Sequence, residues 1–171
     1  YTLRIAQLVA CTEAEGPGRR FAIWLQGCPL RCPNCCNPEM LTERGGTPFT
    51  VAALFAQVVE SRQIEGISLL GGEPFFQAPG LAELCIRIKR ETDLSVMIFS
   101  GYTLEELEKQ GEAAQALLES CDLLVDGRYE EALADDSRRW IGSSNQTVHF
   151  LSERYQPEML DPELRQKNQL E

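Results

Sequence analysis

Short apolar runs separated by polar segments divide the chain at regular intervals. Five of these runs have the length of a strand: residues 21–25, 66–70, 94–99, 121–125 and 147–151. The run at 21–25 is continuous and ends just before Gly27, which is typical of a buried strand that leads into a functional loop. Each of the first four runs ends in a glycine-containing or polar step.

Segments with helical spacing lie between the strand-like runs. Residues 51–59 carry an apolar face and follow Thr50, a residue type that caps helix N-termini, and residues 81–89 repeat the pattern. Thr103 and Glu106 have the spacing of a capping box at the start of another helix. The pattern therefore alternates strand and helix through most of the chain.

Alternating strands and helices predict an α/β fold around a parallel sheet. Five or at most six units of about 30 residues fit the chain, which is too few to close an eight-stranded barrel. We expect a partial (β/α)5-6 barrel with one side open. Ligands of such folds gather beyond the carboxyl ends of the strands, so four strand ends would converge on one site. We expect one domain over residues 1–152 and a polar C-terminal tail over 153–171.

Composition narrows the classes of function. Sixteen Lys and Arg against 26 Asp and Glu give a formal charge of −10, which disfavours nucleic-acid binding. His149 is the only histidine, so a His-rich metal site is excluded. The chain has no apolar stretch of about 18 residues and no signal-peptide run near its start, so we expect a cytoplasmic protein without a membrane partner.

Cysteine is the unusual part of the composition. Four of the seven cysteines lie between residues 28 and 36, and an odd, crowded set is unlike a disulfide framework. Cys28, Cys32 and Cys35 have the spacing C-x3-C-x2-C. Three thiolates can bind three irons of a [4Fe–4S] cluster and leave the fourth open to a small molecule. The alternative is a zinc knuckle in which Cys36 or a distant cysteine is the fourth ligand.

A second motif follows the next predicted strand. Gly71, Gly72 and Glu73 lie just past the run at 66–70 and precede Pro74. Small residues let a ligand approach the backbone, and a carboxylate can accept a hydrogen bond from an ammonium group. Alone, these residues are also an ordinary turn.

The cysteine triplet after one strand, followed by this motif after the next, resembles the radical S-adenosylmethionine (SAM) enzymes. Within that superfamily the chain is most similar to the activating proteins of anaerobic ribonucleotide reductase. The matching stretches are residues 26–28, 37–39, 70–74, 100–107, 124–129 and 139–146. Two residues depart from the pattern: Cys36 and Asn34 stand where relatives commonly have aromatic residues.

The resemblance implies a set of functional residues. Cys28, Cys32 and Cys35 would hold a [4Fe–4S] cluster whose open iron binds the methionine group of SAM. Gly71, Gly72 and Glu73 would line its ammonium group, and Ser100 and Asp126 would contact SAM or the substrate.

The implied activity is radical chemistry on a protein. An external donor such as flavodoxin or ferredoxin would reduce the cluster, and SAM would yield a 5′-deoxyadenosyl radical that abstracts hydrogen from a glycine of a partner reductase. One runner-up is an oxidoreductase that modifies or cleaves a ribosomally made precursor peptide. A non-enzymatic alternative is a zinc or iron–sulfur interaction module.

Several other residues have competing interpretations. Asn145 and Gln146 would position the substrate backbone or simply cap a strand, and Cys36 is either a substrate-facing thiol or a small packed side chain. Three cysteines and two tryptophans are expected to pack in the core: Cys11, Cys85, Cys121, Trp24 and Trp140. Three arginines are expected to be solvated: Arg19, Arg20 and Arg128.

Overall fold

The computed structural model describes residues 1–32, 35 and 38–160 of the chain. Its strands are β1 (Thr2–Thr12), β2 (Arg20–Leu25), β3 (Thr47–Thr50), β4 (Gly66–Gly71), β5 (Ser95–Phe99), β6 (Leu123–Asp126) and β7 (Thr147–Phe150). Its α-helices are α1 (Val51–Glu60), α2 (Ala78–Glu91), α3 (Leu104–Glu108) and α4 (Glu112–Glu119). Four short 3-10 helices are η1 (Pro38–Met40), η2 (Pro74–Gln77), η3 (Glu131–Leu133) and η4 (Pro157–Met159).

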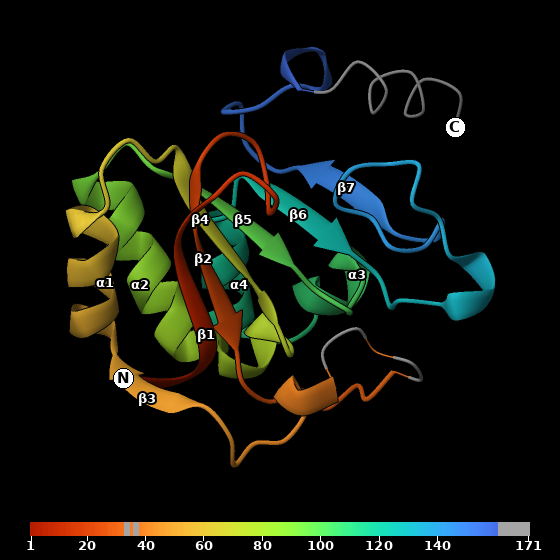
Figure 1. The fold of residues 1–171 in the computed structure, drawn as a ribbon, viewed down its shortest axis with the longest axis horizontal. Helices are drawn as coiled ribbons and strands as arrows, with labels where there is room; N and C mark the ends of the chain where they lie inside the picture. Colours follow the sequence, from red (N-terminus) through yellow and green to blue (C-terminus); the bar gives the residue numbers. More distant parts are fainter. Residues whose placement is uncertain (33–34, 36–37, 161–171) are drawn as a thin grey trace.

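The strands form one mixed sheet in the order β3-β1-β2-β4-β5-β6-β7 (Figure 1). The three pairings among β2, β4, β5 and β6 are parallel, whereas β1, β3 and β7 pair with their neighbours antiparallel. The predicted α/β class is therefore confirmed, but the sheet is not wholly parallel. The run at 147–151 is a strand, as expected, yet residues 127–146 join β6 to β7 without an α-helix that crosses the sheet, and β7 runs antiparallel to β6.

Two segments of the fold were not expected from the sequence. Residues 2–5 alternate exposed and buried positions and residues 6–12 are exposed or partly buried, so β1 lacks the continuous apolar run that identified the central strands. Strand β3 is short and contains Pro48, which is tolerated because β3 lies at the edge of the sheet.

The helices begin where their capping residues predict. Thr50 accepts a hydrogen bond from the Ala53 N–H at the start of α1 (3.0 Å). Thr103 and Glu106 form the expected capping box at α3. These contacts satisfy backbone N–H groups that have no partner within the helix.

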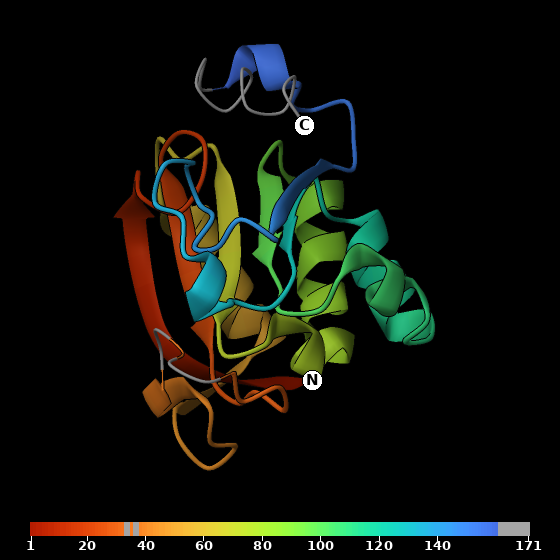
Figure 2. The ribbon, with the colours of Figure 1, turned by 90° about the vertical axis from the view of Figure 1, so that its right-hand side faces the viewer.

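Alternate residues of the central strands face two apolar layers. Val96 and Ile98 belong to the layer beneath α1, α2 and α4, whereas Met97 between them belongs to a second layer. Ile141 and Val148, which follow β6 in the chain, help to form this second layer. Figure 2 shows the segment between β6 and β7 on the other side of the sheet from α2. The sheet is therefore covered on both faces, which explains the continuous apolar runs.

Ionised side chains fix the amino ends of the strands. Arg20 is fully buried and donates hydrogen bonds to Ser68 Oγ (2.8 Å), the Ile67 carbonyl (2.8 Å) and Ser95 Oγ (3.0 Å). The expectation of a solvated Arg20 is therefore wrong, because the neighbouring strands β4 and β5 supply the acceptors that water would have supplied. Burial lowers the pKa of this guanidinium.

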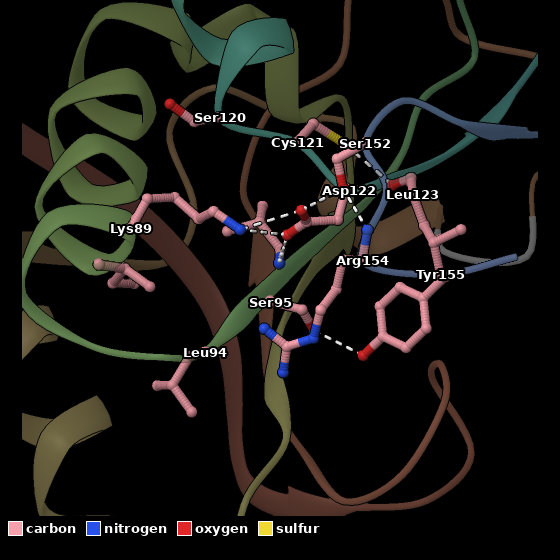
Figure 3. Close-up of polar contacts among 12 residues, drawn as sticks. Lys89, Leu94, Ser95, Ser120, Cys121, Asp122, Leu123, Ser152, Arg154 and Tyr155 are labelled. Carbon is pink, nitrogen blue, oxygen red and sulfur yellow. Dashed lines mark hydrogen bonds and ion pairs between the residues drawn. The ribbon is translucent and has the colours of Figure 1, made fainter.

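Asp122 makes a second buried polar connection, drawn in Figure 3. Its carboxylate, 3% exposed, accepts hydrogen bonds from Lys89 Nζ (2.7 Å), the Val96 N–H (2.8 Å) and Ser152 Oγ (2.6 Å). One side chain thus joins α2, β5 and the segment after β7.

No helix within the described part of the chain is long and apolar enough to span a bilayer.

We expect Asp122→Asn to lower the free energy of unfolding by about 2 kcal/mol, because an amide cannot replace the charged acceptor of three donors. Urea denaturation monitored by circular dichroism measures the change. The matched control is Glu105→Gln, which removes an exposed ion pair with Lys109 and should change stability by less than about 0.5 kcal/mol. Equal effects of the two substitutions would contradict this assignment.

Candidate functional site

A cavity of about 740 Å³ lies at the carboxyl ends of β2, β4, β5 and β6. Eight of the residues selected from the sequence line it: Cys28, Cys32, Cys35, Gly71, Gly72, Glu73, Ser100 and Gln146. Asp126 and Asn145 do not line it, and Cys36 lies outside the described residues. The structure therefore places most of the candidate residues, which are far apart in sequence, around one space.

Hydrogen bonds hold both ends of the cysteine-containing loop. The Gly27 N–H donates to the Met40 carbonyl (2.7 Å), and the Cys28 N–H donates to the Leu41 carbonyl (3.1 Å). Gln26, itself buried, donates from Nε2 to the Thr42 carbonyl (2.6 Å). The segment that leaves β2 thus returns to its starting point, and Cys28 is fixed at the strand end.

The three thiols lie near enough to influence one another. Burial raises the pKa of Cys32, and the neighbouring Cys28 and Cys35 raise it further. In the described ranges, no three His, Cys, Asp or Glu side chains converge closely enough for a single metal ion. A cubane cluster has no such requirement, since each cysteine binds a different iron. The donor set and its spacing therefore fit a [4Fe–4S] cluster.

The other described cysteines are distributed differently. Cys85 and Cys121 are buried, as expected, and burial raises the pKa of Cys85 to about 12. Cys11 is exposed, so its assignment to the core is wrong. Its position near the end of β1, where side chains alternate between faces, accounts for the difference.

The Gly-Gly-Glu motif packs against the start of the cysteine loop. The Gly72 N–H donates to the Leu25 carbonyl (2.8 Å) and the Glu73 N–H donates to the Gly27 carbonyl (2.9 Å). A Cβ atom at Gly72 would lie 2.3 Å from the Gly27 carbonyl oxygen, so only glycine allows this approach. The two motifs are therefore a single packed unit.

Glu73 carries the buried carboxylate of the site. Its side-chain oxygens accept hydrogen bonds from the Phe75 N–H (2.9 Å), Ser100 Oγ (3.0 Å) and the Gly101 N–H (2.8 Å). Burial raises the pKa of Glu73 to about 7, although these hydrogen bonds favour the ionised form. Glu73 thus joins the ends of β4 and β5 and presents a carboxylate that a cation would stabilise.

Asp126 lies behind the wall of the cavity. Its Oδ2 accepts from the Leu104 N–H (2.7 Å) and is 2.9 Å from His149 Nε2. Burial alone would raise the pKa of Asp126, but the neighbouring His149 and the hydrogen bond from the Leu104 N–H outweigh it and lower the pKa. These contacts anchor α3 and β7 to the end of β6.

Asn145 and Gln146 fasten the segment that covers the cavity. Gln146 Oε1 accepts from the N–H groups of Gly142 (2.8 Å) and Ser143 (3.1 Å), and its Nε2 donates to the Gly127 carbonyl (2.9 Å). Asn145 Nδ2 donates to the Arg128 carbonyl (2.8 Å). The two amides therefore tie this wall to the end of β6.

Several residues of the cavity were not selected from the sequence. Glu15 lines it from the loop after β1, and burial raises the pKa of its carboxyl group. Trp140, expected to be a packing residue, also lines the cavity. The Gly-Pro-Gly turn at residues 16–18 is the sequence feature that could have drawn attention to Glu15, because such a turn can fold a loop back over a sheet.

The sequence of the chain matches a family model and several known proteins. Residues 14–149 match the family model described as a 4Fe-4S single cluster domain. The anaerobic ribonucleoside-triphosphate reductase-activating protein of Escherichia coli K12 is 35% identical over 80% of this chain and 92% of its own length. The protein of the same name from Salmonella typhimurium is 33% identical over 87% and 99%, respectively. The crystal structure of QueE from Escherichia coli matches 60% of this chain and 53% of its own, at 19% identity and a TM-score of 0.48.

The raised pKa of Glu73 predicts a specific pH dependence of stability. The usual pKa of this carboxyl group is 4.5 and its value in the folded protein is about 7. The stability that the protonated group contributes to the fold is therefore fully present below pH 4.5 and is lost as pH rises through about 7. We expect Glu73→Gln to remove this loss, which amounts to roughly 3 kcal/mol.

Urea unfolding of cluster-free protein at several pH values from 5 to 8 measures the effect. The unfolding free energy of Glu73→Gln should rise relative to wild type as pH increases. Glu108→Gln, at an exposed position of α3, is the control and should follow the wild-type profile. Parallel profiles for all three proteins would show that Glu73 titrates normally.

Proposed function

Because the chain belongs to the family of anaerobic ribonucleoside-triphosphate reductase-activating proteins, we propose that it cleaves SAM and generates a glycyl radical on a partner reductase. The predicted class, a radical SAM oxidoreductase with an iron–sulfur centre, is confirmed by these relatives and by the 4Fe-4S family match. The observation that carries the proposal is the meeting of three cysteines and Glu73 in one cavity.

We assign Cys28, Cys32 and Cys35 as the ligands of a [4Fe–4S] cluster. When bound and reduced, this group supplies the electron that cleaves SAM into methionine and a 5′-deoxyadenosyl radical. Cys28 holds its position through the backbone bonds of the loop, and the other two thiols are half-buried at the cavity wall. The description of the matching family model, a 4Fe-4S single cluster domain, favours this cluster over the zinc module.

We assign Gly71, Gly72 and Glu73 to the methionine group of SAM. An ionised carboxylate has about four lone-pair positions, and three donors already face Glu73. One position therefore remains for an ammonium group, whose charge would keep Glu73 ionised at neutral pH. Ser100 orients the carboxylate, and Asp126 supports the same strand ends from behind the wall.

The apolar lining of the cavity suits radical chemistry. Four apolar side chains line the cavity: Leu70, Phe99, Val125 and Ile141. A primary carbon radical attacks most C–H bonds it can reach, so excluding water and fixing the substrate are the main tasks of the protein. His149 is engaged with Asp126 outside this lining, which agrees with a step that needs no histidine base.

We further propose that the four parallel strands form a partial radical SAM barrel whose open side receives the partner. In this view residues 1–152 are the catalytic domain and 153–171 form a tail, and Tyr155 anchors the start of that tail in the second apolar layer. A flavodoxin or ferredoxin would supply the electron, and the reductase would supply the glycine. Asn145 and Gln146 would act on the substrate through the wall that they hold.

The experiment that tests the proposal uses anaerobically reconstituted protein. Reduction in the presence of SAM should give 5′-deoxyadenosine, detected by liquid chromatography, and addition of the anaerobic reductase should give the electron paramagnetic resonance doublet of a glycyl radical. A fully loaded protein that makes no 5′-deoxyadenosine with a strong reductant would refute the proposal.

The ligand assignment predicts different effects of two cysteine substitutions. Cys32→Ala should remove most of the bound iron and sulfide and abolish 5′-deoxyadenosine formation, because a cluster held by two cysteines is labile. Cys85→Ala, in the buried face of α2, should keep a full cluster and cost only packing stability. Iron and sulfide analysis measures both, and similar losses in the two variants would disprove the assignment.

A further inference from the structure

Trp140 separates two cavities of the molecule. Its side chain lines the cavity of about 740 Å³ that holds the candidate residues. It also lines a second cavity, of about 510 Å³, together with Glu65, Arg139 and Tyr155. The indole therefore borders two hollow spaces, and it also packs, only partly buried, against the second apolar layer.

The backbone of Trp140 is held in an unusual conformation. Its φ of 66° lies in the left-handed region, where a bulky residue is an outlier. The neighbours on both sides are fixed: Ile141 is buried in the second apolar layer, and buried Arg138 donates to the carbonyls of Ser144 (3.0 Å) and Gln146 (3.2 Å). Such strain persists where the surroundings determine it and is concentrated at ligand sites.

The two faces of the indole differ. The Arg139 guanidinium lies 4.8 Å from the ring centroid, and Arg139 lines the second cavity but not the first. The cation therefore covers the indole from the second cavity and leaves the opposite face toward the first. The Nε1 atom is shielded and has no acceptor among the residues that the structure describes, although buried indoles usually have one. Packing alone does not account for this side chain.

We propose that Trp140 stacks on the purine base of the adenosyl group, and this inference rests on the proposed cleavage of SAM. A flat aromatic face is the surface on which a nucleobase gains most from contact, and its attraction does not depend on hydrogen bonds. Glu73 and Gly72 lie in the wall of the same cavity, so one ligand can contact both regions. Gln146 acts as a positioning residue for the platform, since it fixes the turn that follows Trp140.

Equilibrium binding of 5′-deoxyadenosine to the reconstituted protein tests the inference without requiring turnover. Trp140→Leu should weaken binding of the nucleoside about tenfold, whereas Trp140→Phe should keep affinity within about threefold, because an aromatic ring remains. Methionine binding and iron content should not change in either variant. The control is Trp24→Leu, at a strand position that lines neither cavity.

A second measurement avoids dependence on the folding of Trp140→Leu. In the reconstituted Trp24→Phe variant, Trp140 is the remaining tryptophan, and 5′-deoxyadenosine should quench its fluorescence in a saturable way. In Trp140→Phe the remaining Trp24 should not respond.

The possible results separate the two proposals. Unchanged nucleoside affinity in Trp140→Leu, or no quenching of Trp140, would overturn the stacking role and leave SAM cleavage standing. A wild-type protein that binds the nucleoside through Trp140 but forms none from SAM would retain the platform and refute the proposed function. A wild-type protein that does not bind the nucleoside would refute the platform.

Discussion

The buried carboxylate of Glu73 is the constraint on which the site depends. A carboxylate that is 1% exposed needs donors, and the ends of β4 and β5 provide them through Phe75, Ser100 and Gly101. Meeting that need brings two strand ends together, and the backbone bond from Glu73 to Gly27 adds the end of β2. The side-chain hydrogen bonds thus supply the solvation of the carboxylate, and the backbone of the same residue holds the start of the cysteine loop. A cationic ligand would complete that solvation, so binding and architecture use the same group.

The opposite end of the sheet is fixed by buried charges of both signs. Buried Arg20 bonds to β4 and β5 at their amino ends, and Asp122 connects α2 with β5. Buried ions are expensive unless every polar atom is paired, so these networks permit few alternative registers. A sheet that is held at both ends can present loops of irregular shape between the ends of its strands. The strained backbone at Trp140 and the close approach at Gly72 are features that such a rigid frame can support.

The central strands could be predicted from the sequence because strands that are buried on both faces consist of continuous apolar runs. The runs at 21–25 and 66–70 became β2 and β4, and Thr50 and Thr103 marked helix starts correctly. Strand β1 was missed because its side chains alternate, and the direction of β7 was missed because no apolar pattern records pairing direction. The burial of Arg20 could not be predicted, since its acceptors come from residues about 50 to 75 positions away. The residues of the candidate site that belong to short contiguous motifs were predicted from the sequence. Glu15 and Trp140 were not assigned to the site, because only the fold brings them to the cavity.

Residues of a recognisable motif need not touch the ligand to determine its environment. Asn145 and Gln146 attract attention as polar residues near a strand end, yet their amides bond to backbone groups of Gly127, Arg128, Gly142 and Ser143. An amide side chain suits this task because it donates and accepts at once without carrying charge into an apolar wall. The two amides therefore add uncharged bonds to a covering segment that Arg138 also holds, beside a cavity lined by the carboxylates of Glu15, Glu73, Asp135 and Asp136. Among these carboxylates Glu73 is the one whose hydrogen bonds join the strand ends, so the group that selects a cation is also the group that organises the site.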